Sequence, residues 1–168
     1  MSEKQRYIIL NHQQIQDKIR RIAFQILEDT FGEREIIIAG ILDKGYCFAE
    51  RIKQALETIA DIEVQLIKMQ INKTGAVLDG STDSPLEICN QKTIILVDDV
   101  LNSGKTLAYG FGMFLNIPVK KIRTVVLVNR SHRMFPITVD FSGLEITTTL
   151  KEHIHVVLDS YHDVVYLS

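Results

Sequence analysis

Aliphatic runs alternate with helical patterns through most of this chain, and this alternation constrains the fold more than any other feature. The runs are almost entirely apolar, which is typical of strands covered on both faces. Between them, apolar residues recur at the spacing of one helix face. Strands that alternate with helices pair in parallel, with helices on both faces of the sheet. We therefore expect an α/β fold with a parallel central sheet flanked by helices. The expected strands are 35–42, 62–71, 92–97 and 122–128, and the expected helices are 11–30, 46–59 and 106–115.

The pattern changes after Val128, where short β-like segments replace the alternation of strands and helices. They predict a small C-terminal β hood at about residues 129–168, on a core at about residues 11–128. No linker separates the two parts, and 168 residues suffice for one domain with a sizeable core. We therefore expect a single domain over residues 1–168. The short pieces are 137–141, 154–158 and 163–167.

The composition excludes several classes of protein. The net charge of −2 gives no reason to expect a nucleic acid or an anionic membrane as partner. The apolar runs are too short to span a bilayer, and no apolar signal segment follows the N-terminus. Cys47 and Cys89 lack metal-binding spacing, so we expect free thiols in a reducing compartment. The expected location is cytoplasmic.

Residues 94–106 read Ile-Ile-Leu-Val-Asp-Asp-Val-Leu-Asn-Ser-Gly-Lys-Thr and carry the clearest chemical signal. Asp98 and Asp99 follow a buried strand, at the sheet edge where ligands bind in open α/β folds. The loop that follows ends at a helix N-terminus, which suits a phosphate. Two carboxylates beside it can accept hydrogen bonds from vicinal hydroxyls. The segment therefore predicts a sugar-phosphate site.

Two other interpretations of this segment are weaker. The triplet Gly104-Lys105-Thr106 matches the end of a nucleotide-triphosphate P-loop. That loop needs a glycine five positions before Gly104, and Asp99 stands there instead, where it would repel phosphates. Alternatively, an acidic turn could cap the helix with Ser103 as N-cap, but this explains neither carboxylate.

The segment resembles the phosphoribosyl-diphosphate (PRPP) motif of type I phosphoribosyltransferases: a hydrophobic strand, two acids, two apolar residues and a small-residue loop. It departs at Asn102, where several members carry Thr, Ala, Asp or Tyr. The resemblance implies transfer of the 5-phosphoribosyl group from Mg²⁺-bound PRPP to a nucleobase by a homodimer or higher homo-oligomer. It assigns Asp98 and Asp99 to the ribose hydroxyls and the positive charge on the sugar. The 5′-phosphate would be held by Asn102, Ser103, Gly104, Lys105 and Thr106.

Two further segments gain a role from this resemblance. Taken by itself, the turn Asp43-Lys44-Gly45 is either a solvated turn or an anion site at a helix start. The resemblance makes it the diphosphate loop. Residues 72–91 lack periodicity and read as a long loop, either an ordinary insertion or a flap over the substrate. Relatives carry Tyr or Arg in the flap, and here only Lys73 could take that role.

The base-binding residues are expected after the fourth strand. That stretch resembles both the uracil phosphoribosyltransferases that double as pyrimidine-operon attenuators and the hypoxanthine-guanine enzymes. Asn129 and Arg130 are candidate base contacts, although the basic run there also reads as a solvated turn. Phe141 would stack on the base and Ser142 would offer backbone groups, unless Phe141 is a core residue. No protein metal ligand is expected, because Mg²⁺ would arrive with PRPP.

Two amides favour a pyrimidine over a purine. The purine enzymes place an acid at the position of Asn102 and a lysine at the position of Asn129. A neutral amide is no useful proton acceptor, so uracil is the expected base. A purine enzyme and a non-catalytic PRPP- or nucleotide-sensing regulator remain alternatives. RNA binding is disfavoured, because Arg20 and Phe24 replace the Thr and His of RNA-binding relatives and a polyanion needs many contacts.

Overall fold

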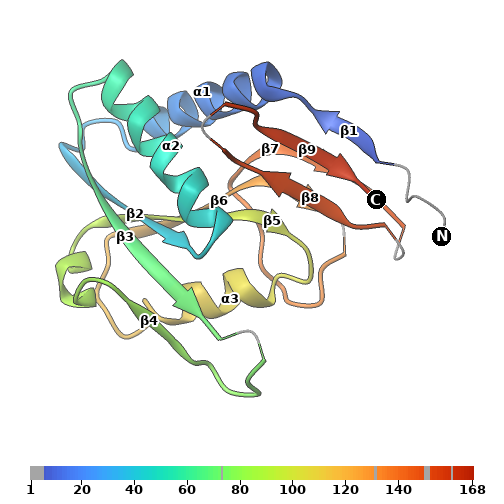
Figure 1. Cartoon of the computed structure of the whole chain (residues 1–168). Helices are drawn as coiled ribbons and strands as arrows, with labels where there is room; N and C mark the ends of the chain where they lie inside the picture. Colours follow the sequence, from blue (N-terminus) through green and yellow to red (C-terminus); the bar gives the residue numbers. More distant parts are fainter. Residues whose placement is uncertain (1–5, 73, 131, 150–151, 160) are drawn as a thin grey trace.

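The computed structural model describes residues 6–72, 74–130, 132–149, 152–159 and 161–168, which form two sheets (Figure 1). The main sheet has six strands in the order β4-β3-β2-β5-β6-β7. Its strands pair in parallel except at the edge, where β4 is antiparallel to β3. The expected parallel α/β fold is thus confirmed. The strands are β2 (Glu35–Ile41), β3 (Glu63–Ile71), β4 (Gly80–Thr82), β5 (Thr93–Leu101), β6 (Lys121–Arg130) and β7 (Phe141–Ile146).

Helices cover both faces of the main sheet (Figure 1). Helices α1 (His12–Asp29) and α2 (Lys44–Ile59) pack on one face. Helix α3 (Lys105–Gly112) and the short 3₁₀ helix η1 (Leu86–Cys89) pack on the other. Successive residues of a strand point to opposite faces, so the central strands need apolar residues at every position. Within the described residues, no helix is long and apolar enough to cross a membrane.

The start of α1 confirms the expected capping box. Asn11 accepts a hydrogen bond from the backbone N–H of Gln14, and the Gln14 side chain accepts one from the backbone N–H of Asn11, both at 2.9 Å. Two free N–H groups of the first helical turn are thereby satisfied. The cap fixes where α1 begins relative to the strand that precedes it.

The second sheet differs from the expected hood. It consists of β1 (Tyr7–Leu10), β9 (Val164–Leu167) and β8 (Ile154–Val157) in that order, all antiparallel. An N-terminal strand therefore joins the C-terminal pair, and β7 leaves the hood to pair in parallel with β6. The small C-terminal β hood is confirmed in β8 and β9, but β1 joins it and β7 does not, because pairing partners depend on long-range register that short β-like pieces do not reveal.

Other expected boundaries also shift. The segment 72–91 contains both β4 and η1, and β4 folds back on β3 as a hairpin. Strands β5 and β6 extend past the expected ends at Val97 and Val128, because each continues to pair with the other. These extensions carry polar residues into the sheet, which local hydrophobicity could not indicate.

A cluster of charges ties the end of α1 to the start of β6. Arg123 donates three hydrogen bonds of 3.0–3.1 Å to the carboxylate of Asp29. Lys121 Nζ lies 2.9 Å from the same carboxylate and donates to the Asp29 carbonyl at 2.7 Å. The hydrogen bond from Arg123 is the main cause that lowers the pKa of Asp29 below its ordinary value of 3.8. The Asp29 side chain is 22 % exposed, so solvent screens the pair in part.

Replacing Asp29 by Asn should lower the free energy of unfolding by on the order of 1 kcal/mol at neutral pH. Because folding lowers the pKa, the carboxylate stabilises above pH 3.8 and loses this effect as the pH falls through the folded-state pKa. The gap between variant and wild type should therefore close in acid. Urea unfolding at neutral pH and at about pH 3 measures it. An unchanged gap, or an equal loss in the exposed control Asp17→Asn, would contradict this role.

Candidate functional site

A crevice opens where β5 separates from β2. Their pairing ends at Gly40 and Val97, whereas β5 stays paired with β6 as far as Leu101. Helix α2 follows β2 on one face of the sheet and α3 follows β5 on the other. Ligands bind at such a switch point in open α/β sheets. A cavity of about 370 Å³ lies there, lined by the ends of both strands and the turns that follow.

The two predicted carboxylates line this cavity from within β5. Asp98 is 6 % exposed, and its Oδ1 accepts a hydrogen bond of 2.9 Å from the backbone N–H of Asp99. Asp99 lines the same cavity and is less buried. The strand holds both carboxylates on a rigid support. They are placed to accept hydrogen bonds from hydroxyl groups in the cavity.

The loop that follows β5 lines the cavity beside the carboxylates, through Asn102, Ser103, Gly104 and Thr106. Gly104, not Ser103, is the N-cap of α3, with a left-handed φ of 84°. A Cβ there would also lie 2.8 Å from Ile137, so the position favours glycine on both grounds. The start of α3 faces this loop, and the first turn of a helix suits an anion.

Lys105 does not line the cavity, and its role in binding phosphate stays a prediction. Its Nζ donates to the Gly75 carbonyl at 3.3 Å and lies 5.4 Å from the centre of the Tyr109 ring. The side chain therefore ties the β3–β4 loop to α3.

The turn after β2 forms the opposite wall. Asp43 and Lys44 line the cavity, and the Leu42–Asp43 peptide bond is cis. Gly45 does not line it but packs against β5. A Cβ on Gly45 would lie 2.9 Å from Asp98 Cα and 2.9 Å from Asp98 Oδ1. The missing side chain thus lets the turn approach the acid pair, and the expected diphosphate loop sits across the cavity from the expected phosphate loop.

Arg130 and Asn129 lie at the end of β6 and are absent from the cavity lining. Arg130 is buried and donates to the Thr148 hydroxyl, to the Thr149 carbonyl at 2.7 Å and to Asn102 Oδ1 at 3.4 Å. It joins the phosphate loop to the segment before the hood. Asn129 Nδ2 donates to Glu145 at 3.3 Å, while its buried Oδ1 has no hydrogen-bond partner among the described residues.

Phe141 and Ser142 do not line the cavity, and their base contacts stay predictions. Phe141 opens β7 opposite Val125 and packs on the core beneath α1. The Ser142 carbonyl accepts a hydrogen bond of 3.0 Å from Arg21 of α1. Ser142 pairs with Val126 and so lies level with Asp98, but β6 stands between β7 and the acid pair. Lys73, the expected flap residue, lies outside the described residues.

Sequence reasoning missed two contributions from distant segments. Ile154, the first residue of β8, lines the cavity from the hood. Lys68 of β3 lines a neighbouring cavity of about 200 Å³ that shares Leu42 with the first. Its Nζ lies 4.6 Å from the centre of the Tyr46 ring. The only sequence signal for Lys68 was a cation near the end of a predicted strand.

Comparison with known proteins places this arrangement in a family. The family described as "Phosphoribosyl transferase domain" matches residues 6–163. The chain is 32 % identical to the "Bifunctional protein PyrR" of Bacillus subtilis, over 92 % of this chain and 91 % of that protein. It is 34 % identical to the protein of the same name from Staphylococcus saprophyticus, over 95 % and 94 % of the two chains.

Solved structures share the fold at lower identity. A hypoxanthine-guanine phosphoribosyltransferase from Bacillus anthracis superimposes with a TM-score of 0.73 at 24 % identity, over 83 % of this chain and 81 % of that one. A hypoxanthine phosphoribosyltransferase from Staphylococcus aureus gives a TM-score of 0.71 at 18 % identity, over 84 % and 77 %. At these identities the likeness establishes the fold alone.

Gly45→Ala should lower the free energy of unfolding by about 1–3 kcal/mol, because the new methyl group would overlap the backbone of Asp98. Gly112→Ala is the matched control, since its Cβ would meet the flexible end of Leu78 at 3.1 Å. We expect the control to change stability by less than about 0.5 kcal/mol. Urea unfolding of both variants measures the difference. Equal effects would show that the close approach at Gly45 is not required.

Proposed function

The chain belongs to the type I phosphoribosyltransferases, on the branch of the pyrimidine-operon attenuators, and we propose that it transfers the phosphoribosyl group of PRPP to uracil. The observation that carries the proposal is a single cavity lined by an acid pair, a phosphate-type loop and a lysine turn. In the reaction, the bond from C1′ to the diphosphate oxygen breaks and a bond from C1′ to uracil N1 forms. Diphosphate leaves, and the N1 proton is lost to water.

The acid pair would act on the ribose. Asp98 and Asp99 can accept hydrogen bonds from the 2′- and 3′-hydroxyls, and their negative charge opposes the positive charge that grows on the sugar. Burial of Asp98 lowers the local dielectric and strengthens this interaction. Asp99 is the more exposed of the two, so we assign it the closer approach to the sugar charge.

The two ends of PRPP would bind on either side of that pair. The 5′-phosphate fits the loop at Ser103, Gly104 and Thr106, where helix N–H groups and hydroxyls converge. The diphosphate fits the turn at Lys44. Lys68, in the adjoining cavity, is a second cation on the diphosphate side. This order places C1′ between the acid pair and the leaving group.

Mg²⁺ fits as a companion of PRPP. Among the described residues, no group of three or more His, Cys, Asp or Glu side chains is arranged to hold a metal. Mg²⁺ prefers octahedral oxygen ligands and keeps several waters, so substrate oxygens can supply what the protein does not. When bound it would neutralise charge on the diphosphate, while the chain's own residues orient the sugar.

The choice of uracil rests on two amides. Asn102 lines the cavity, and its Oδ1 accepts a hydrogen bond of 3.4 Å from Arg130. The Asn102 amide is thereby oriented to present N–H donors to the cavity, which suits the carbonyl oxygens of a pyrimidine. Asn129 is also a neutral amide, at the position where the purine enzymes carry a lysine. Ile154 supplies an apolar surface for the base from the hood.

A regulatory function is the second candidate, and one observation favours it. The relatives at 32–34 % identity carry the name "Bifunctional protein PyrR". A chain that kept the cavity but lost catalysis could still sense PRPP or a nucleoside monophosphate by binding. A homodimer or higher homo-oligomer remains a prediction, and RNA binding remains disfavoured for this chain. Diphosphate release with a panel of bases separates the two functions.

PRPP with Mg²⁺ should raise the melting temperature, because it binds the folded state alone. At a hundredfold excess over the dissociation constant the stabilisation is about 2.7 kcal/mol, or a shift on the order of 5 °C. Differential scanning fluorimetry measures it, with ribose 5-phosphate as a partial ligand for comparison. If millimolar PRPP left the melting temperature of the folded protein unchanged, the proposal that PRPP binds would be wrong.

Asp99→Asn should lower kcat by roughly 100-fold with little change in KM for PRPP, because the carboxylate opposes charge that grows only in the transition state. Thr106→Val should raise KM by about tenfold with a smaller change in kcat, since the phosphate is held in both states. Steady-state kinetics on both variants separates these roles. If both variants changed kcat to the same extent and KM to the same extent, these two roles would be contradicted.

Uracil should be preferred over guanine and hypoxanthine by on the order of a hundredfold in kcat/KM. A purine at this site would lose two charge-assisted hydrogen bonds, each worth about 1.5–3 kcal/mol. A pyrimidine has no N7, so it does not lose the hydrogen bond that an acid at position 102 would make there. Asn102→Asp should narrow the preference for uracil, and Lys18→Ala, on α1 and outside the cavity lining, serves as control. A native preference for a purine would overturn the assignment.

A further inference from the structure

A second and larger cavity lies away from the cavity of the acid pair. It is a groove of about 780 Å³ between α1 and α2, on the sheet face opposite α3. Each helix lines it with one stripe of side chains at helical spacing. Its floor is apolar, formed by Ile19 from α1 with Ala55 and Ile59 from α2. This volume can hold a ligand of nucleotide size.

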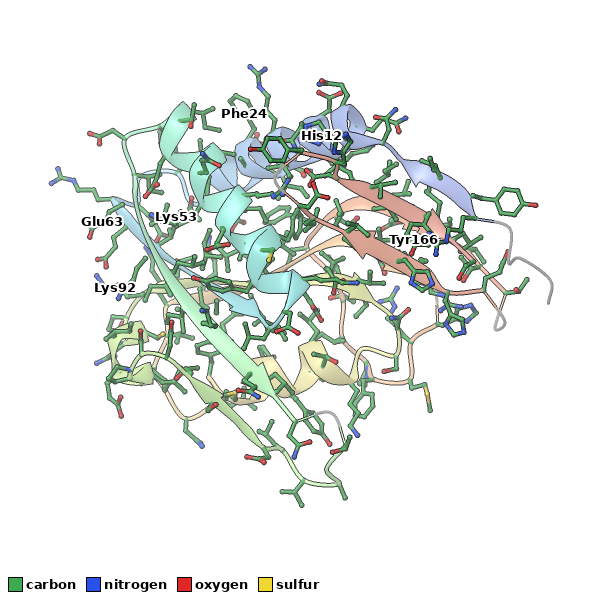
Figure 2. All side chains as sticks on the ribbon, viewed as in Figure 1. His12, Phe24, Lys53, Glu63, Lys92 and Tyr166 are labelled. Atoms are coloured by element: carbon green, nitrogen blue, oxygen red, sulfur yellow. The ribbon has the colours of Figure 1, made fainter. Side chains whose placement is uncertain are left out.

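The ionisable groups that line the described part of the groove are all basic: Arg20, Arg51 and His12. Arg20 is exposed and makes no ion pair with a carboxylate among the described residues, and its guanidinium lies 5.9 Å from the centre of the Phe24 ring. Figure 2 shows His12 and Phe24 along α1, beside the hood. The groove therefore favours an anionic ligand.

Two contacts from the segment before β9 fix the orientation of the Arg51 side chain. Asp163, whose side chain is fully buried, accepts hydrogen bonds from Arg51 Nη1 and from Gln16 Nε2, the latter at 2.8 Å. Arg51 Nη2 donates to the Asp159 carbonyl. A guanidinium has five N–H donors, so others remain for a ligand, and the Arg51 side chain is 22 % exposed. A cation whose orientation is already fixed loses little entropy when it binds an anion.

His12 lies at the same end of the groove. Its Nδ1 is 3.3 Å from the backbone nitrogen of Asp163 and 3.4 Å from the Asp163 carboxylate, and these contacts orient the ring. Farther along the groove, Gln54 and Thr58 supply an amide and a hydroxyl next to the apolar floor. Cations at one end, with an apolar floor and hydrogen-bonding side chains along it, match a phosphate attached to a flat polar ring.

We propose that the groove between α1 and α2 binds a nucleoside phosphate, as a second site separate from the cavity of the acid pair. The phosphate contacts Arg20, Arg51 and His12, and the ring lies on the apolar floor within reach of Gln54 and Thr58. The site does not depend on the proposed transferase activity. Through Asp163, the residue before β9, its cations are joined to the hood that carries Ile154.

The test is a residue-resolved titration of the full chain. Amide spectra of ¹⁵N-labelled protein, with PRPP and Mg²⁺ saturating the first cavity, are recorded as AMP is added. Saturable shifts at Gln54 and Thr58 are expected. Arg20→Ala should weaken this binding by about tenfold, the value of one charge-assisted hydrogen bond. Lys18→Ala removes the same charge from the same helix outside the groove and should leave binding unchanged.

Three results would overturn the proposal. The first is the absence of shifts in the groove at millimolar AMP. The second is equal weakening by Arg20→Ala and Lys18→Ala, which would indicate only a general charge effect. The third is that inorganic phosphate or a single-stranded RNA oligonucleotide shifts the amide resonances of Gln54 and Thr58 as strongly as AMP does, or shifts them when AMP does not. Because the shifts are assigned to residues, failure of PRPP to bind would be seen separately at Asp98 and Thr106.

Discussion

The whole site depends on one change of strand pairing, at Val97. Up to that residue β5 is paired on both sides, with β2 and β6, and its side chains are buried in two hydrophobic clusters. Beyond it β5 keeps β6 and loses β2. The backbone stays rigid while one flank opens, so two carboxylates can sit in a sheet and still face a cavity. A loop could not hold them so firmly.

Close backbone approaches then bring the other walls to that flank. Gly45 lets the turn of Asp43 and Lys44 approach Asp98, and Gly104 lets the opposite loop pass Ile137. Each glycine sets the distance between walls of the cavity, which is why a methyl group at either position should disturb the cavity through packing.

The hood completes the cavity and is held by buried charges. Arg130 joins the loop at Asn102 to residues 148–149, and Asp163 joins the hood to α2 through Arg51. Removing one partner of such a buried group leaves the other unsatisfied, which costs more than the contact itself is worth. The same arrangement lets the α1–α2 groove and the first cavity share one support.

The sequence alone determined the alternation of strands and helices, the capping box at Asn11 and the segment that carries Asp98 and Asp99, because these signals are local. Periodicity, caps and a motif need only neighbours along the chain. Tertiary structure decided that Phe141 packs against the core, that Lys105 faces Gly75, and that Ile154 reaches the cavity. These facts depend on which distant strands pair and in what register. Pairing is settled by the burial of whole faces, and no short stretch of sequence contains that information.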